Sequence, residues 1–283
     1  MIDLHTHTTA SDGRCTPGEL VARASAAGVT VLSVTDHDTV AGSDAAAVAC
    51  RTAGIEFVRG IEITAVRDSA DVHVLGYFVD AASPALQNFL AEQRRRRINR
   101  VREMIHRLAG LGIHLDADAI LKPGIDDPSI AVGRPWIAGA LVAGGHVATK
   151  NDAFDQFLSR GRPAYVPRAG ASPEEVIGHI HDAGGLASIA HPALIGRDDW
   201  LHDFADAAAD ALEVFHPDHD ADATTRYMAL AKRLGLAVTG GSDYHADQSH
   251  GATAPGSVSL PREHYDGLRA TRRATASGDD TSS

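Results

Sequence analysis

Seven short apolar runs constrain the fold of this chain most, because each carries a histidine or an acidic residue within it or just after its end. The runs cover residues 2–4, 29–34, 55–63, 72–79, 186–190, 211–215 and 236–239. Apolar runs of this length that are rich in β-branched residues are typical of buried strands. In parallel β/α folds the carboxyl ends of the strands lie at one face, where active sites form. The pattern therefore predicts an α/β fold whose strand ends converge on one polar site.

Helical signals separate most of these runs. Capping boxes at Thr16 and Ser172, each followed by proline, predict two helix starts. The alternation of strands and helices stops between residues 84 and 165, which read as a mostly helical insertion. The sequence thus assigns residues 1–83 and 166–270 to one unit of alternating strands and helices, which would hold the polar site. Residues 271–283 are polar and rich in serine and threonine, and we expect a disordered tail there.

The polar residues at the strand ends are of the types that bind divalent metals without thiolates. A single histidine after a strand is more often structural, so the joint pattern carries the prediction. His5 and His7 are separated by one residue, and in an extended segment both side chains point to the same side. Imidazole and carboxylate ligands suit Zn²⁺, Mn²⁺ or Fe²⁺. Glu62 has two oxygens and could bridge two ions about 3.5–4 Å apart.

Composition excludes several classes of protein. The chain has 283 residues, of which 44% are hydrophobic, so it is not a disordered chain. Its two cysteines, Cys15 and Cys50, cannot form a disulfide framework or a thiolate zinc site. A net charge of −11 argues against general electrostatic capture of nucleic acid. We expect a cytoplasmic protein with no membrane partner, because neither a membrane span nor a signal sequence is evident; the oligomeric state is not indicated.

In its motifs the chain resembles the PHP (polymerase and histidinol phosphatase) family. The motifs lie at residues 3–7, 11–13, 35–38, 60–62, 73, 190–192 and 241–245. The resemblance runs through nearly all of residues 1–250. It is strongest to small stand-alone phosphoesterases that act on nucleotides, among them 3′,5′-nucleoside bisphosphate phosphatases and 5′–3′ RNA-trimming members.

The resemblance implies a fold and a metal centre. The fold is a distorted (β/α)7 TIM-like barrel with a helical insertion over the active site, which contains an Arg-Pro pair, here Arg134-Pro135. The centre holds three divalent ions, each Mn²⁺, Fe²⁺ or Zn²⁺. Its implied ligands are, for the first ion, His5, His7, Glu62 and Asp243; for the second, Asp12, His37 and the shared Glu62; and for the third, His73, His191 and His245.

The resemblance further implies a phosphoesterase that hydrolyses a phosphomonoester of a small nucleotide through a metal-bridging hydroxide. A nucleoside 3′,5′-bisphosphate or a 5′-monophosphate is the expected substrate, and a short RNA end is a further partner. Three divalent ions bring six positive charges, and their three carboxylate ligands remove half. One hydroxide and one phosphate dianion would balance the rest.

Three further residues are candidates on the substrate side. Arg134 would make a bidentate phosphate contact. His216 is the candidate for substrate contact or general acid, with His219 second. Asp38 either orients His37 or belongs to a turn.

Other functions stay open at this point. Histidinol phosphate, a sugar phosphate or a cyclic phosphate could be the substrate, and a 5′–3′ exoribonuclease is a further alternative. An amidohydrolase-type barrel also begins with His-x-His, but none of the three lysines follows a predicted strand. A non-enzymatic binding module is the remaining alternative, although all nine expected ligand positions are filled. Relatives usually carry Leu-Gly in the region of residues 246–254 and often histidine at Trp136, and both departures bear on the substrate.

Overall fold

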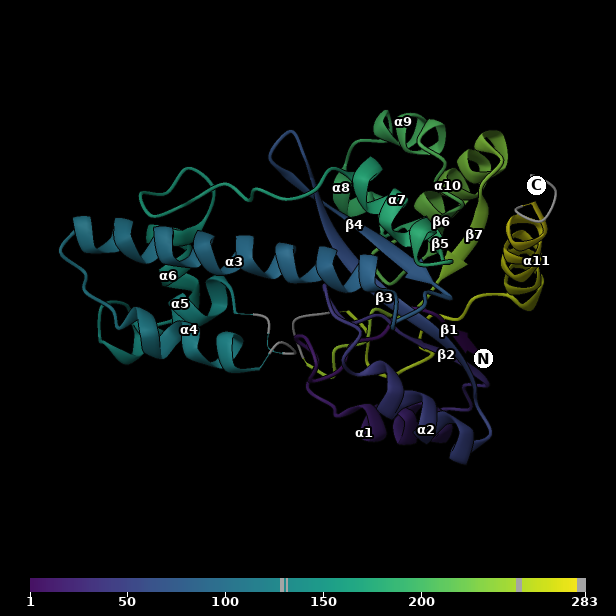
Figure 1. Cartoon of the computed structure of the whole chain (residues 1–283), viewed down its shortest axis with the longest axis horizontal. Helices are drawn as coiled ribbons and strands as arrows, with labels where there is room; N and C mark the ends of the chain where they lie inside the picture. Colours follow the sequence, from purple (N-terminus) through teal and green to yellow (C-terminus); the bar gives the residue numbers. More distant parts are fainter. Residues whose placement is uncertain (128–129, 131, 248–250, 279–283) are drawn as a thin grey trace. The chain divides into compact units, whose positions relative to one another are not determined.

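The barrel consists of seven strands that follow one another in the sheet in sequence order (Figure 1). The computed structural model describes residues 1–127, 130, 132–247 and 251–278. Leu4 N–H donates to Gly240 O at 3.2 Å, and an isolated parallel bridge joins Thr6 to Tyr244, so the last strand returns to the first. The predicted α/β barrel is thereby confirmed. The strands are β1 (Ile2–Asp3), β2 (Val31–Val34), β3 (Glu56–Arg67), β4 (Ala70–Tyr77), β5 (Leu186–Ile189), β6 (Ala211–Phe215) and β7 (Ala237–Gly240).

The direction of β4 departs from the expectation of parallel strands. β4 pairs antiparallel with both β3 and β5, whereas the other neighbouring strands are parallel. Asp68 and Ser69 alone connect β3 to β4, and both have positive φ, at 49° and 64°. A two-residue connection with this backbone makes a tight hairpin, which forces the strands to be antiparallel. His73, in the first half of β4, therefore lies beside Thr64, near the end of β3.

Seven helices accompany the strands in the described part of this unit, which comprises Met1–Phe89 and residues from Ala171 onward. The capping boxes at Thr16 and Ser172 are present as predicted, and each leads into a helix with proline in its first turn. Several of these helices turn an apolar face inward, as α7 does with Val176, Ile177 and Ile180. The helices are α1 (Pro17–Ala26), α2 (Ser43–Ala53), α7 (Pro173–Asp182), α8 (Pro192–Ile195), α9 (Trp200–Asp206), α10 (Ala221–Leu234) and α11 (Arg262–Gly278).

The prediction of a disordered tail from Thr271 is wrong for most of that segment. Helix α11 continues to Gly278. Tyr265 and Leu268 anchor it with fully buried side chains, and the alanines and arginines that follow are strong helix formers. Residues 279–283 lie outside the described residues.

A second compact unit spans Leu90–Gly170. Its core contains Met104, Leu108, Ile137 and Leu141, all fully buried. Most of α3 (Pro84–Gly110) belongs to this unit, together with α4 (Ala117–Asp126), α5 (Arg134–Ala143), α6 (Lys150–Ala153) and a π-helical turn, η1 (Phe154–Leu158). Among the described residues, no helix has the length and apolar character that crossing a membrane requires.

Candidate metal centre

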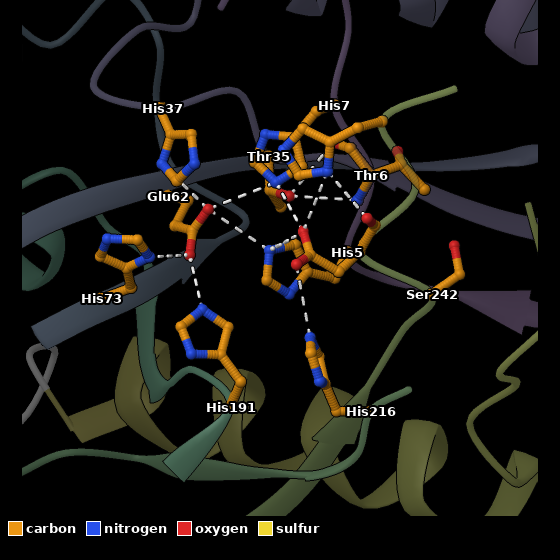
Figure 2. Close-up of polar contacts among 12 residues, drawn as sticks. His5, Thr6, His7, Thr35, His37, Glu62, His73, His191, His216 and Ser242 are labelled. Carbon is orange, nitrogen blue, oxygen red and sulfur yellow. Dashed lines mark hydrogen bonds and ion pairs between the residues drawn. The ribbon is translucent and has the colours of Figure 1, made fainter. Parts of the chain in front are cut away.

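Glu62 lies at the centre of the candidate site, with a side chain only 1% exposed (Figure 2). Its Oε1 is 2.8 Å from His73 Nδ1 and 3.1 Å from His191 Nε2. These two histidines come from paired segments, since Ala190 N–H donates to His73 O at 3.0 Å. The antiparallel pairing of β4 with β5 thus places two imidazoles on one carboxylate oxygen.

The second oxygen of Glu62 faces three more imidazoles. Oε2 is 3.1 Å from His37 Nδ1, 3.3 Å from His7 Nε2 and 3.4 Å from His5 Nε2. His5 and His7 follow β1, and both side chains are fully buried toward the same side, as their spacing predicts. His37 follows β2, and its backbone forms an isolated parallel β-bridge with that of Glu62. Five histidines from four segments therefore converge on one carboxylate.

Asp243 approaches the same histidines from the loop after β7. Its Oδ1 is 3.2 Å from His5 Nε2 and 3.1 Å from His7 Nε2. The backbone N–H of Asp243 donates to His5 O at 2.8 Å, and its φ is 50°. Gly241 allows this approach, because a Cβ there would lie 2.3 Å from His5 N. The Gly-Gly-Ser stretch before Asp243 is therefore needed for the two segments to meet.

A third grouping forms around Asp12, which is half exposed. Its Oδ1 is 3.3 Å from His245 Nε2, and its Oδ2 is 3.6 Å from His37 Nε2. The family resemblance groups His245 with His73 and His191, whereas its imidazole lies beside Asp12 in the structure. The segment after β7 runs beside the loop that carries Asp12, since Arg14 N–H donates to His245 O at 2.8 Å. His245 thus reaches Asp12, while His73 and His191 share Glu62.

Buried polar atoms without hydrogen bonds mark the centre as a cation site. His5 Nε2, both ring nitrogens of His7 and Glu62 Oε2 form no hydrogen bond with any described residue. Leaving such atoms unsatisfied costs about 1–3 kcal/mol each. Around the centre, four overlapping groups of histidine and carboxylate residues have ligand atoms within 4.8 Å of one another. Lone pairs that converge without hydrogen bonds suit a shared divalent ion, so this donor set fits a metal centre.

The pKa shifts of the buried residues also favour a bound cation at this site. Burial lowers the pKa of His7, but Asp243 and Glu62 outweigh burial and raise that pKa to about 10. Burial likewise raises the pKa of Glu62, yet the surrounding histidines hold it well below its usual range. The buried carboxylates therefore favour positive charge on their neighbours, which a divalent ion would supply.

His216 lies inside the site. It follows β6, its side chain is 1% exposed, and its Nε2 is 3.4 Å from Asp243 Oδ2. Its Nδ1 accepts the backbone N–H of Asp218 at 3.2 Å. His219 lies next to it, with ring centroids 5.4 Å apart, and its Nδ1 is 2.9 Å from Val214 O. Both candidates for the substrate side therefore come from the loop after β6.

Asp38 contacts the backbone of β3. Its Oδ1 accepts the N–H of Thr64 at 2.9 Å, and its own N–H donates to Glu62 O at 2.8 Å. With φ of 53°, Asp38 forms the bend that brings His37 to Glu62. These contacts correspond to the turn role, which the sequence left open beside the orienting role.

Two buried carboxylates escaped the sequence prediction. Asp3 accepts hydrogen bonds from Ser242 N–H at 2.9 Å and from Ser242 Oγ–H at 2.6 Å. Glu213 lies 3.0 Å from His5 Nδ1. Both are acids inside otherwise apolar strand runs, and that position was the signal that could have singled them out.

The structure describes Arg134 and part of the segment 246–254, in which this sequence differs from its relatives. Arg134 is the first residue of α5 in the Leu90–Gly170 unit, where its guanidinium lies 5.8 Å from the Phe154 ring. Its phosphate contact stays a prediction. In the segment 246–254, residues 248–250 lie outside the described residues. A cavity of about 500 Å³ is lined by Arg23, Tyr244, Ala246, Asp247, Gly251, Ala252 and Thr253.

Known proteins resemble this chain along most of its length. The family model described as PHP domain matches residues 3–155. A 3′,5′-nucleoside bisphosphate phosphatase of Chromobacterium violaceum is 36% identical over 265 residues, covering 92% of each chain. A 5′–3′ exoribonuclease, Rnm, of Salmonella typhimurium is 38% identical over 253 residues, covering 86% of this chain and 84% of the relative. A phosphoribosyl 1,2-cyclic phosphate 1,2-diphosphodiesterase of Eggerthella lenta is 31% identical, with coverage of 86% and 93%.

Solved structures agree with this assignment. A protein of Bifidobacterium adolescentis, proposed to be a metal-dependent phosphoesterase, superimposes with a TM-score of 0.80 at 33% identity and 95% coverage of both chains. A Chromobacterium violaceum protein described as an amidohydrolase, with bound sulfate and no metal, gives a TM-score of 0.78 at 34% identity. It covers 95% of this chain and 96% of its own. The chain therefore belongs to the PHP family of metal-dependent phosphoesterases.

Proposed function

We propose that this phosphoesterase hydrolyses a phosphate monoester of a small nucleotide, such as a nucleoside 3′,5′-bisphosphate or a 5′-monophosphate. The observation that carries the proposal is the convergence of histidines and carboxylates on the two oxygens of Glu62. The relatives named as a nucleoside bisphosphate phosphatase and as exoribonucleases support the nucleotide part. A short RNA end is a second substrate form within the same proposal.

Three divalent ions, each Mn²⁺, Fe²⁺ or Zn²⁺, would fit the three groupings. His5, His7, Glu62 and Asp243 would hold the first. Such ions lower the pKa of a coordinated water toward 7 and stabilise negative charge on phosphoryl oxygens. Of the remaining ligands, one group would be His73 and His191 with the shared Glu62, and the other would be Asp12, His37 and His245.

The chain's own residues would bind and orient the ester. Arg134 would hold a phosphate through two parallel N–H···O bonds. His216 would contact the substrate or give a proton to the leaving oxygen from Nε2, because its Nδ1 is engaged by the Asp218 N–H. Asp38 would keep His37 in position by fixing the loop after β2 to the backbone of Thr64.

The composition of the inserted unit supports a polyanionic substrate. Residues 90–170 contain 13 arginines and lysines but eight aspartates and glutamates, in a chain with a net charge of −11. Positive charge in one unit of an acidic protein favours phosphate-bearing ligands. The proposal therefore joins an anion-binding unit to a metal-binding barrel in one chain.

A substrate panel tests the proposal. Mn²⁺-loaded enzyme is assayed for phosphate release from nucleoside 3′,5′-bisphosphates, 5′-monophosphates, histidinol phosphate, a sugar phosphate, a cyclic phosphodiester and short 5′-phosphorylated RNA. We expect the highest kcat/KM with a nucleotide monoester, and no activity after chelation. No release from any compound by enzyme with bound metal would overturn the phosphoesterase proposal. Preference for histidinol phosphate or the cyclic ester would replace the nucleotide.

A further inference from the structure

Glu213 is a buried acidic residue whose carboxylate has no access to solvent. It lies in the middle of β6, and its side chain is 0% exposed. Its Oε1 is 3.0 Å from His5 Nδ1, and its Oε2 accepts the backbone N–H of His191 at 2.8 Å. One carboxylate thus joins two of the candidate ligands, which follow different strands. A buried carboxylate is costly unless its hydrogen bonds are satisfied, and here both oxygens have a partner.

The contact with His5 determines which ring nitrogen can bind a metal. A carboxylate only accepts hydrogen bonds, so Nδ1 of His5 must carry the proton that it donates to Glu213. In the neutral imidazole that binds a metal, Nε2 is then free of hydrogen, and it faces the opposite way, 3.4 Å from Glu62 and 3.2 Å from Asp243. Metal-binding histidines typically donate their second ring N–H to such an acceptor, which fixes the tautomer and raises the basicity of the ligand.

The contact with His191 supports a strained backbone. His191 has φ of 24° and ψ of 63°, a conformation that few residues with a side chain adopt. The Glu213 carboxylate holds its N–H directly, while His191 Nε2 lies 3.1 Å from Glu62 Oε1. The same acid therefore fixes the imidazole of one ligand and the backbone of another.

We infer that Glu213 is a positioning residue of the metal centre: it holds His5 as the Nδ1–H tautomer, with Nε2 directed at the ion, and fixes the strained turn of His191. The inference rests on the proposed metal-dependent function, but it concerns how the ligands are prepared and not which ester is cleaved. Glu213 itself touches neither substrate nor ion. Its effect on the reaction passes through His5 and His191.

Glutamine at position 213 would reverse the direction of the hydrogen bond with His5 Nδ1. The amide offers one acceptor oxygen and one donor NH₂, whereas the site presents two donors. If the oxygen accepts from His191, the NH₂ faces His5 Nδ1 and favours the Nε2–H tautomer. That tautomer points a hydrogen at the ion. A metal ligand held in the wrong tautomer loses affinity, and partners of this kind are worth about 10- to 100-fold.

The experiment measures metal affinity and not turnover. Glu213→Gln is compared with wild type by competition against a graded chelator, with bound ions counted by elemental analysis, and we expect at least about a 10-fold loss of affinity. Glu213→Asp keeps the charge and both acceptors, and we expect it to recover part of that affinity. Phosphate release is recorded separately, so that a wrong substrate does not affect the result.

Asp210→Asn is the matched control. Asp210 Oδ2 lies 2.7 Å from His181 Nε2 and accepts the N–H of Ala187 at 2.8 Å. Asp210 therefore has the same two kinds of partner as Glu213, away from the metal centre. We expect Asp210→Asn to lower the melting temperature and to leave metal affinity unchanged. Equal metal affinity in Glu213→Gln and wild type would overturn the inference.

A spectroscopic measurement decides the case even if Glu213→Gln fails to fold. In the Zn²⁺-loaded wild-type protein, ¹⁵N chemical shifts of the histidine rings report which nitrogen binds the ion. We expect His5 to coordinate through Nε2 and to show a slowly exchanging Nδ1–H proton. Coordination of His5 through Nδ1, or a rapidly exchanging ring proton, would show that Glu213 does not set the tautomer.

Discussion

Glu62 uses both carboxylate oxygens, which together face five of the candidate ligand histidines. Its Oε1 faces His73 and His191, and its Oε2 faces three further histidines, all between 2.8 and 3.4 Å. An amide at this position would keep the volume and lose the charge. Replacing Glu62 by glutamine therefore tests the effect of the charge while the shape of the side chain is conserved.

Glu62→Gln should lose bound ions and activity together. The amide NH₂ would face imidazole nitrogens that are needed as ligands, and the remaining buried charge could not balance two ions. We expect phosphate release to fall at least about 100-fold, more than the loss of an outer hydrogen-bond partner causes. Elemental analysis and a phosphate assay measure both effects. The exposed Glu174→Gln is the control, and an active, fully loaded Glu62→Gln enzyme would contradict the assignment.

His216→Asn should separate turnover from metal binding. General acids contribute about 10²- to 10⁴-fold, and the asparagine cannot deliver a proton. We expect kcat to fall within that range while the ion content stays the same. Normal turnover would remove His216 from the mechanism. A loss of ions in parallel would instead make it a support for Asp243, whose Oδ2 lies 3.4 Å away.

At the scale of elements, the strands were the easiest part to predict and their directions the hardest. Seven apolar runs and two capping boxes identified the seven strands and the starts of α1 and α7, because both signals are local. The reversal of β4 depends on the Asp68-Ser69 turn, which occupies two residues that the apolar pattern leaves outside any strand. The place of His245 and the roles of Asp3 and Glu213 depend on which segments lie side by side, and periodicity along one chain does not contain that information.

His181 of helix α7 and Asp210, which directly precedes strand β6, form a pair that responds to pH. His181, in the last turn of α7, lies 2.7 Å from Asp210, and this hydrogen bond raises the pKa of the imidazole. A raised pKa in the folded state stabilises the fold at pH values below about 6.5, the unfolded value. That contribution is lost as the pH rises through the folded-state pKa.

His181→Asn should therefore lower stability most at acidic pH. Because the side chain of His181 is 35% exposed, we expect a difference of at most about 1 kcal/mol near pH 5.5, vanishing as the pH rises. Urea unfolding of both proteins from pH 5.5 to 8.5 measures it. A difference that grows with pH would contradict the sign.

The molecule as a whole should depend on its ions for stability as well as activity. Ions that bind only the folded chain add about 2.7 kcal/mol at a concentration 100 times their dissociation constant. Chelation should thus lower the melting temperature and abolish phosphate release, and Mn²⁺ should restore both. Calorimetry and the phosphate assay follow the cycle. An unchanged melting temperature and unaffected activity after verified removal of all metal would contradict the metal centre.

Because the last strand returns to the first, the metal centre can be completed only late in translation. The barrel closes where Leu4 meets Gly240 and where Asp243 meets His5, so the centre joins the beginning of the chain to a segment made much later. Asp243 follows His7 by 236 residues, which takes a ribosome about 12–47 s at about 5–20 residues per second. During that time the growing chain carries the His-x-His pair without Asp243. The complete centre can therefore be loaded only late, once nearly the whole barrel has been made.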